Sequence, residues 1–504
     1  MGTVWTKEQQ EVMNLRDCNM LVSAAAGSGK TAVLVERIVS RIMDDRKPVD
    51  IDRLLVVTFT NAAAAEMRER IAGALEEKLE QQPENVHLQR QATLIHQARI
   101  TTIHSFCLDV IRNHFDRISL DPGFRIGDEG ELKLLRQEVM EQLLEEEYEE
   151  SRPEFEKFAE SFAPGRTDGR MEEVIGEFFD FSMGYPWPEE WRQRCLKEYQ
   201  AETWEEAEAA EWLQALLEKL ALTVKDLGKQ MEQALNTAKE QDGPRTYLPM
   251  LESDLAMLEK LQDCKSYRAY ADFFQKELSW EPLSRKKDPE ASEANKTLVK
   301  RIRDQVKYEV YRIQEEYFFE SPEQILEDIR GAAPLVEELV RLAGRFQQMY
   351  QARKEEKNLV DFADLEHYAL EILVRKEGEE TVPTVTAWEY AMEFEEVMID
   401  EYQDSNLVQE ILLSSVSSPE RHNRFMVGDV KQSIYRFRLA RPELFMEKYH
   451  GYARDGGENR RIDLHKNFRS RSQVLEGVNL VFRQIMTEKL GDVEYDDDAA
   501  LYPG

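Results

Sequence analysis

Long apolar runs, cysteine and an excess of positive charge are all scarce or missing in this sequence. No apolar stretch approaches the ~20 residues that a membrane-spanning helix needs, so we expect neither a membrane span nor a membrane partner. The first residues hold no basic segment leading into an apolar one, which predicts no secretory signal. The four cysteines are far apart and lack the spacing of a zinc site. Such sparse usage favours a reducing, cytoplasmic setting.

Negative charge dominates the composition. The 99 Asp and Glu residues outnumber the 66 Lys and Arg residues, giving a formal net charge of -33. Because phosphate binding requires Lys and Arg, this balance argues at first against a nucleic-acid partner. Net charge is a sum over the whole chain, however, and a protein can keep a basic groove within an acidic body. Composition alone therefore leaves the partner open.

Two kinds of hydrophobic pattern alternate along the 504 residues. Residues 19–115 and 394–470 contain short, β-branched apolar runs that predict buried parallel strands of an α/β sheet. The runs are Asn19–Ser23, Leu54–Thr58, Arg99–Ile103, Val397–Ile399, Arg424–Val427 and Arg461–Leu464. Residues 126–385 read as almost wholly helical, with apolar stripes from Leu213 to Leu220 and from Leu335 to Met349. We predict an α/β lobe interrupted by a large helical insertion, with a second lobe beginning near residue 446.

A glycine-rich segment directly follows the first predicted strand. Residues 24–31 read Ala-Ala-Ala-Gly-Ser-Gly-Lys-Thr and open a predicted amphipathic helix. Backbone N–H groups of such a loop point at phosphates, so it is predicted to bind a nucleotide. The residues that would do so are Ala26, Gly27, Ser28 and Gly29. Lys30 is predicted to neutralise the β- and γ-phosphates and Thr31 to bind Mg²⁺. Because Ala24 replaces the first glycine of the pattern, a simple glycine-rich turn is the alternative.

The second half of the predicted nucleotide site lies far downstream. The strand Val397–Ile399 runs directly into Asp400-Glu401-Tyr402-Gln403-Asp404. Carboxylates at the end of a buried strand are costly unless a cation or a reaction uses them. We predict that Asp400 binds Mg²⁺ and that Glu401 polarises the attacking water as general base. An acidic surface turn is the alternative, and the glycine-rich loop in the same chain argues against it.

Two further polar segments follow predicted strands. Residues 428–433 read Gly-Asp-Val-Lys-Gln-Ser, and residues 464–470 read Leu-His-Lys-Asn-Phe-Arg-Ser. Gln432 is a candidate sensor of the γ-phosphate or of the attacking water. Arg469 is a candidate arginine finger, and Phe468 offers a ring for the adenine base. Spacing alone does not establish these three roles.

Together these segments resemble superfamily 1 DNA helicases of the UvrD/RecB type, and most nearly the helicase–nuclease A subunits (AddA) of AddAB complexes. The match is collinear and covers nearly the whole predicted α/β part. In that family the loop has the form A-x-x-G-x-G-K-T, which accounts for Ala24. Thr6-Lys7-Glu8-Gln9 resembles the Q motif, in which Gln9 would read adenine. The other matching segments are residues 58–70, 101–106, 361–365, 428–440 and 464–470. Residues 120–126, Leu-Asp-Pro-Gly-Phe-Arg-Ile, favour AddA over UvrD itself.

The resemblance implies DNA contacts along one face of the first lobe. The implied residues are Phe59, Thr60 and Asn61 beside the strand, Thr102, His104 and Ser105 near its phosphates, and Tyr435, Phe437 and Arg438 in a base-stacking patch. Aromatic faces accept any base, which suits a sequence-tolerant grip. From the residues alone, the alternative for Phe437 is packing in the core, and the alternative for His104 is a structural role.

The resemblance also implies a RecA-like P-loop NTPase fold divided in a stated way. Residues 1–125 and 386–445 would form the first RecA-like lobe, residues 126–385 a helical accessory domain, and residues 446–504 the start of a second RecA-like lobe. The family's later motifs and its nuclease domain have no counterpart in these 504 residues. We therefore expect this chain to bind ATP but to hydrolyse it poorly alone.

The implied function is that of an ATP-dependent DNA helicase with 3′-to-5′ polarity. It would be one subunit of a helicase–nuclease that processes double-strand DNA ends for recombinational repair, with exonuclease activity in the full-length protein. ATP and Mg²⁺ are the implied cofactors. Single-stranded DNA, duplex ends and an AddB-like second subunit in a heterodimer are the implied partners. A stand-alone UvrD-like repair helicase and a non-hydrolysing DNA-end-binding scaffold are the alternatives.

Overall fold

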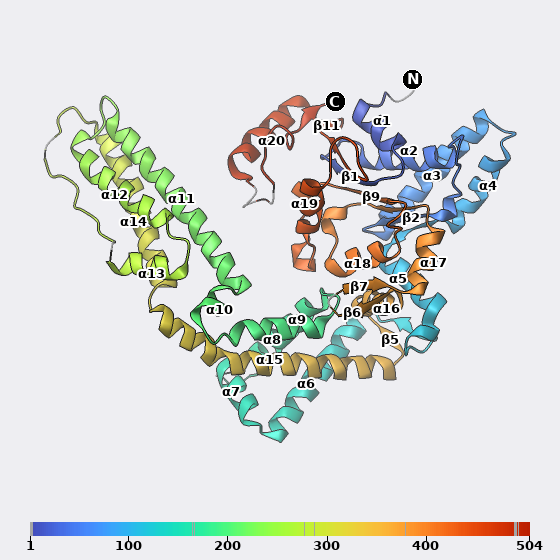
Figure 1. The fold of residues 1–504 in the computed structure, drawn as a ribbon, viewed down its shortest axis with the longest axis horizontal. Coiled ribbons are helices and arrows are strands. Elements are labelled where there is room, and N and C mark those ends of the chain that lie inside the picture. The colour runs from blue at the N-terminus through green and yellow to red at the C-terminus, as the bar shows by residue number, and fades with distance from the viewer. Residues whose placement is uncertain are drawn as a thin grey trace. The chain divides into compact units, whose positions relative to one another are not determined.

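The computed structural model describes residues 4–163, 165, 167–276, 278–286, 288–378, 380–487, 491 and 493–504. The chain forms two compact units (Figure 1). The sheet unit comprises Met1–Leu144, Gly176–Pro188 and Arg345–Gly504, and the helical unit comprises Glu145–Ile175 and Glu189–Gly344. None of the described helices is long and apolar enough to cross a membrane.

A six-stranded parallel sheet in the order β10-β1-β9-β8-β2-β3 forms the centre of the sheet unit. Its strands are β1 (Asn19–Ala24), β2 (Leu54–Thr58), β3 (Arg99–Thr102), β8 (Glu396–Ile399), β9 (Arg424–Gly428) and β10 (Asn459–Leu464). They are the six apolar runs that the sequence predicts as strands, with bounds that agree to within two residues. The expected mixed α/β fold with a parallel sheet is confirmed.

Helices bury both faces of this sheet, as its apolar strands require. Successive strand residues point to opposite faces, so Met20 belongs to one buried cluster and Leu21 to the other. The Met20 face packs against α1 (Lys7–Asn14), α2 (Lys30–Ile42), α3 (Asn61–Gln81) and α4 (Val86–Leu94). The Leu21 face packs against α5 (Ile103–His114), α16 (Phe362–Leu373), α17 (Val385–Glu393), α18 (Leu407–Ser415) and α19 (Pro442–Gly451).

Strand β10 lies within the residues that are predicted from the sequence to start a second lobe. This strand pairs in parallel with β1, from Asn19 opposite Asn459 to Ala24 opposite Leu464. Ile462 and Leu464 also join the buried cluster on the Met20 face. The physical reason is that an apolar strand must satisfy its backbone hydrogen bonds, and the edge of β1 supplies partners for them. The next elements are β11 (Lys466–Asn467), α20 (Ser472–Ile485) and β12 (Tyr502–Pro503), and β11 pairs with β12.

Among its described residues, the helical unit contains helices and no strands. Its complete helices are α7 (Pro153–Phe162), α10 (Trp204–Glu208), α11 (Glu211–Lys239), α12 (Leu248–Gln262), α13 (Tyr267–Lys276) and α14 (Glu293–Tyr317). The helices that continue into the sheet unit are α6 (Glu129–Glu150), α8 (Gly169–Met183), α9 (Pro188–Tyr199) and α15 (Pro322–Glu356). The predicted stripe residues Leu213, Leu217 and Leu220 lie in its core.

The helical unit contains fewer residues than the predicted insertion of residues 126–385. Helix α16 falls inside that range but packs on the sheet, and α17, which starts at the last residue of the range, does the same. Two short strands, β6 (Val374–Glu377) and β7 (Glu380–Pro383), form an antiparallel hairpin between them in the chain. Two more, β4 (Arg125–Ile126) and β5 (Leu359–Val360), pair in parallel within the sheet unit. Helical periodicity predicts the helices but not which core each of them joins.

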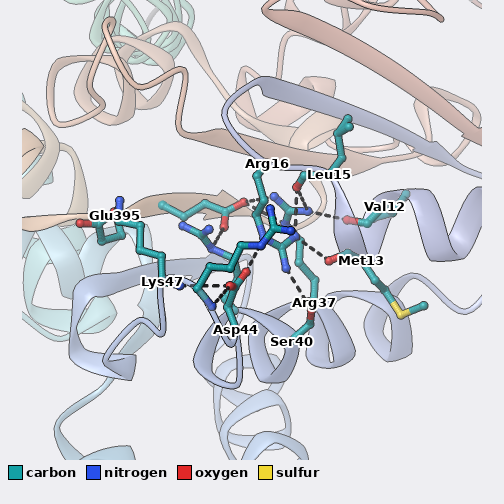
Figure 2. A network of polar contacts seen from close by, with 12 residues as sticks. Val12, Met13, Leu15, Arg16, Arg37, Ser40, Asp44, Lys47 and Glu395 are labelled. Carbon is teal, nitrogen blue, oxygen red and sulfur yellow. Dashed lines mark hydrogen bonds and ion pairs between the residues drawn. The ribbon is translucent and has the colours of Figure 1, made fainter.

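A buried network of arginines ties three elements of the sheet unit together. Arg37 and Arg41 of α2 face the carboxylate of Glu396, the first residue of β8, at 2.6 and 3.1 Å. Arg37 also donates to the carbonyl oxygens of Val12 and Leu15 at the end of α1 (Figure 2). All three charged side chains are buried. The network therefore holds α1, α2 and β8 in one arrangement.

Candidate functional site

Every strand of the parallel sheet ends at the same edge, and the loops beyond that edge hold the predicted functional residues. In open α/β sheets this carboxyl edge is where ligands bind. The segments that meet there follow β1 (residues 25–31), β2 (59–61), β3 (102–105), β8 (400–404), β9 (429–433) and β10 (465–469). The topology thus brings together segments that are up to several hundred residues apart in the sequence.

The glycine-rich loop has the backbone that a phosphate cradle needs. Gly27 and Gly29 have φ angles of 70° and 84°, values that side chains other than glycine adopt at a cost. Helix α2 starts at Lys30, with Thr31 in its first turn, so its N-terminal N–H groups face the loop. A Cβ atom at Gly27 would lie 2.7 Å from Asn467 Nδ2. The loop is therefore packed too closely for any other residue at position 27.

Gln9 fastens the loop to the first helix. Its Nε2 donates to the carbonyl oxygen of Ser28 at 3.1 Å, and its Oε1 accepts from the backbone N–H of Thr6 at 2.9 Å. Thr6 and Gln9 form a capping box at the start of α1. A cavity of about 200 Å³ opens beside them, and its wall includes Phe468 and Tyr502. The structure thus brings Gln9 and Phe468, both predicted to bind the adenine, to one cavity.

Lys30 and Glu401 form the central contact of the predicted nucleotide site. Lys30 Nζ lies 2.9 Å from Glu401 Oε2. Glu401 has a φ of 50°, which is the left-handed region and uncommon for a residue other than glycine. Backbone strain of this kind is found most often at functional sites. The geometry places one cation and one carboxylate where the loops after β1 and β8 meet.

The carboxylates around Glu401 are held in an environment that opposes their ionisation. Burial and the neighbouring charge of Glu401 raise the pKa of Asp400 to about 6. Burial and Glu401 likewise raise the pKa of Asp404 to about 6. A cation placed beside Asp400 would favour its charged form. An ionised Asp400 carboxylate suits a divalent cation, and the binding of that cation by Asp400 and Thr31 stays a prediction.

Gln403, for which the sequence predicts no role, connects the segments after β8 and β9. Its Nε2 donates to Glu401 Oε2 at 2.9 Å, and its Oε1 accepts from the backbone N–H of Asp429 at 3.0 Å. A Cβ atom at Gly428 would lie 2.2 Å from that oxygen. Gln432 Nε2 in turn donates to Asp429 Oδ2 at 2.7 Å. Gln432 is thus joined to Glu401 through Asp429 and Gln403.

The segment after β10 lies directly on the glycine-rich loop. Asn467 Nδ2 donates to the carbonyl oxygen of Ala26 at 2.6 Å, and the N–H of Phe468 donates to that of Gly27 at 2.9 Å. The carboxamide oxygen of Asn467 accepts from the backbone N–H of Arg469 at 2.9 Å. Phe468 and Arg469 are therefore brought to the loop, as predicted, while their individual roles stay predictions. Asn467 was not singled out as a site residue from the sequence.

The aromatic residues predicted to contact DNA form one aromatic cluster. The rings of Phe59 and Tyr435 lie 4.8 Å apart, and those of Tyr435 and Phe437 lie 5.8 Å apart. The guanidinium of Arg438 lies over both Tyr435 and Phe437. Phe437 is 76% exposed, so it does not belong to the core. The alternative of core packing for Phe437 is wrong.

The hydroxyl groups of Thr60 and Thr102, both predicted to contact DNA, serve as helix caps. Thr60 caps α3, which begins at Asn61, by accepting from the N–H of Ala63. Thr102 caps α5 by accepting from the N–H of Ser105, and the two hydroxyl oxygens lie 3.0 Å apart. Each hydroxyl keeps further capacity for a hydrogen bond. The structure thus shows a local role for them and leaves their DNA contact a prediction.

A cavity of about 690 Å³ lies between the aromatic cluster and the acidic segment after β8. His104 and Phe362 form part of its wall, with ring centroids 4.9 Å apart. His104 Nε2 lies 3.2 Å from Glu366 Oε1. Glu366 directly follows the Asp-Phe-Ala-Asp-Leu segment noted in the sequence. The Glu366 carboxylate was not identified from the sequence, because only the fold shows that α16 faces α5.

In the wall of this cavity, Lys354 holds the start of α16. Its Nζ lies 2.9 Å from Asp361 Oδ2 and 2.6 Å from Asp364 Oδ2, and all three side chains are largely buried. Asp361 is the N-cap of α16 and forms a capping box with Asp364. No sequence signal identifies Lys354, because it lies near the end of a long polar helix. This cluster fixes the helical turn that presents Phe362 and Glu366 to the cavity.

Comparisons with known proteins agree with this geometry. Proteins named as the A subunits of ATP-dependent helicase/nucleases are 49% identical in Lachnoclostridium phytofermentans, 43% in Clostridium beijerinckii and 45% in Anoxybacillus flavithermus. These alignments cover 100%, 100% and 99% of this chain, but 37%, 41% and 42% of the relatives. The chain thus spans about two fifths of their length. The model of the UvrD/REP helicase N-terminal domain matches residues 5–453, and the chain belongs to that family.

Proposed function

We propose that this chain is the nucleotide- and DNA-binding part of an ATP-dependent DNA helicase, one subunit of a helicase–nuclease that processes DNA ends for recombinational repair. The observation that carries the proposal is the Lys30–Glu401 contact at the carboxyl edge of the sheet, with the aromatic cluster on neighbouring loops. The family and the printed names of its relatives support it. In this proposal the sheet is a RecA-like P-loop lobe with a helical accessory domain inserted, and a second RecA-like lobe follows β10.

ATP would supply the phosphoanhydride bond whose hydrolysis drives movement, and Mg²⁺ would offset the charge of its phosphates. Lys30 would exchange Glu401 for phosphate oxygens, while the loop N–H groups from Gly27 to Lys30 hold the anion. Glu401 Oε2 would then keep Gln403 as its donor and take a proton from the attacking water. Thr31 and Asp400 would hold the cation, and Arg469 would neutralise charge at the γ-phosphate. Gln9 and Phe468 would bind the adenine.

The loops after β2, β3 and β9 would hold single-stranded DNA. Phe59, Tyr435 and Phe437 offer ring faces to bases of any sequence, and Arg438 adds a cation beside them. The chain of hydrogen bonds from Glu401 through Gln403 to Asp429 links the acidic segment to the segment that carries Tyr435 and Phe437. Binding or hydrolysis of the nucleotide at Glu401 would therefore be coupled to the DNA-binding residues through these hydrogen bonds. We propose 3′-to-5′ movement, a cytoplasmic location and an AddB-like partner protein from the family resemblance.

ATP binding and hydrolysis by matched variants test this function. In the full-length reading frame that contains this chain, Lys30→Ala should abolish binding of a fluorescent ATP analogue. Glu401→Gln should keep that binding and lower DNA-stimulated hydrolysis by at least about a hundredfold, because the general base is lost. Lys47→Ala and Glu395→Gln are controls, because these residues form a separate surface ion pair. Unchanged hydrolysis in Glu401→Gln would overturn the mechanism.

Two further measurements separate the alternatives. A DNA-end-binding scaffold would bind DNA but show no hydrolysis in the unchanged protein. A stand-alone helicase would hydrolyse ATP and unwind DNA at full rate without a second subunit. The proposed complex instead predicts a heterodimer by native mass measurement and nuclease activity in the intact assembly.

A further inference from the structure

His104 and Glu366 form a polar pair on the wall of the 690 Å³ cavity. His104 Nε2 lies 3.2 Å from Glu366 Oε1. The side chain of His104 is 36% exposed, whereas that of Glu366 is 8% exposed. The Phe362 ring lies 4.9 Å from the imidazole and limits how it can turn. Nothing in the proposed mechanism uses Glu366.

Two other donors surround the Glu366 carboxylate. Gln409 Nε2 lies 2.7 Å from Oε1, and Asn406 Nδ2 lies 3.3 Å from Oε2. Burial opposes the charged form, but the hydrogen bond and charge of His104, with those two amides, lower the pKa of Glu366. The group is therefore an ionised carboxylate at neutral pH. An ionised carboxylate only accepts hydrogen bonds, so the contact with His104 requires a proton on Nε2.

With a proton fixed on Nε2, the charge of the ring determines whether Nδ1 accepts or donates a hydrogen bond. In the neutral ring, Nδ1 carries a lone pair and repels an anionic oxygen. In the charged ring, Nδ1 carries a proton and donates. We propose that Glu366 is a positioning residue that holds His104 in the Nε2-protonated form, so that His104 binds a DNA phosphate only as an imidazolium. The grip on single-stranded DNA then weakens as His104 loses its second proton. This inference rests on the proposed DNA-binding function.

Other charged groups also face the cavity that His104 lines. The carboxylates are Asp180 of α8, Asp361 at the start of α16, and Asp400, Glu401 and Asp404 after β8. The cations are Arg136 of α6, Lys354 of α15 and Arg438 after β9.

Most of the cavity's charged groups are paired within it. Arg136 is paired with Asp180 at 2.7 Å, and Lys354 with Asp361 at 2.9 Å. Burial and the charge of Glu401 raise the pKa of Asp400 and that of Asp404 to about 6, so an effect of pH on DNA binding has to be assigned to His104 by substitution.

The protonation state of His104 can be read without DNA. Long-range ¹⁵N–¹H spectra of the histidine side chains, compared with those of His104→Gln, identify the His104 signals. We expect the Nε2-protonated tautomer at pH 8, and a smaller fraction of it in Glu366→Gln, which keeps the shape and removes the charge. Glu371→Gln, on the same helix, is the matched control and should leave the tautomer of His104 unchanged. An Nδ1-protonated tautomer, or His104 signals that ignore Glu366→Gln, would overturn the proposal.

Affinity for a fluorescent oligothymidylate, measured from pH 6 to 8.5 at constant salt, tests the consequence. We expect the unchanged protein to lose about tenfold in affinity over this range through His104. His104→Gln should remove that component and His96→Gln, an exposed histidine, should retain it.

If His104→Gln shows the same pH profile as the unchanged protein, the inference fails while DNA binding stands. If no variant binds the oligonucleotide at any pH, the proposed function fails, and the phosphate contact fails with it. The tautomer measurement distinguishes these two results, because it requires no DNA.

Discussion

Lys30 Nζ lies 2.9 Å from Glu401 Oε2, although 371 residues separate the two in the chain. Lys30 follows β1 and Glu401 follows β8, and β9 lies between these two strands, so the contact spans the middle of the sheet. The same carboxylate oxygen accepts from Gln403 Nε2. A change at either neighbour therefore acts on Glu401 directly.

The hydrogen bonds of Gln403 predict that substitutions at Gln403 and at Gly428 act through the same contact. Gln403→Ala should lower ATP hydrolysis while leaving nucleotide binding intact, because Glu401 loses a donor but the glycine-rich loop is unchanged. It also leaves the buried N–H of Asp429 without an acceptor, at a cost of about 1–3 kcal/mol in stability. Gly428→Ala should have a similar effect, because its Cβ would lie 2.2 Å from Gln403 Oε1.

A double-mutant cycle tests this coupling in hydrolysis and in urea unfolding. Since both changes break one contact, the double variant should lose little more than either single variant. Strictly additive losses would show that the two positions act independently.

The buried arginine network predicts a large loss of stability on removal of its carboxylate. Glu396→Ala leaves Arg37 and Arg41 buried without their partner and should lower the free energy of unfolding of the sheet unit by about 3–5 kcal/mol. Glu66→Ala breaks an exposed ion pair with Arg70 and should cost less than about 1 kcal/mol. Urea titrations of both variants make the comparison. Equal midpoints would contradict the structural role of the network.

The lowered pKa of Glu410 predicts that part of the protein's stability is lost in acid. Burial opposes its ionisation, but the charges of Arg424 and Lys448 and a hydrogen bond from Tyr402 lower the pKa of Glu410 to about 2. A carboxyl whose pKa is lowered by folding stabilises the protein above its unfolded pKa. That contribution is lost as pH falls from about 4.5 to 2, and it corresponds to about 3 kcal/mol.

Glu410→Gln should therefore be less stable than the unchanged protein at pH 7 and lose less on acidification. Urea midpoints at pH 7 and pH 3 measure both. A variant whose stability falls as steeply with pH as that of the unchanged protein would refute the assignment.

The aromatic cluster predicts a specific loss of DNA affinity. Phe437→Ala removes a ring that is 76% exposed, so folding should be little affected. Loss of one base-stacking surface should weaken single-stranded DNA binding by about 1–3 kcal/mol, irrespective of sequence. Phe115→Ala removes an exposed ring elsewhere in the same unit and is the control. Fluorescence anisotropy with homopolymers of two different bases measures the effect, and a loss confined to one base would contradict stacking.

Local sequence was enough to predict the elements and many of the residues that meet at the sheet edge. The strands are short runs with apolar residues, and most of the loops after them carry glycine, carboxylate or aromatic residues, because strand burial and phosphate binding impose strong local patterns. The glycine-rich loop, Asp400 and Glu401 were predicted in this way, whereas the run from Tyr435 to Arg438 was implied by the family resemblance. Their individual chemical roles stay predictions.

Tertiary structure alone decided how the nucleotide loop and the acidic segment make contact. The distance from Lys30 to Glu401, the strain at Glu401 and the bridge through Gln403 depend on strand order, which local patterns do not encode. The same holds for β10, whose apolar pattern fits an edge of either lobe until β1 supplies its backbone partners. It also holds for Glu366 and Lys354, because a buried charge is recognised only by the partners that the fold places around it.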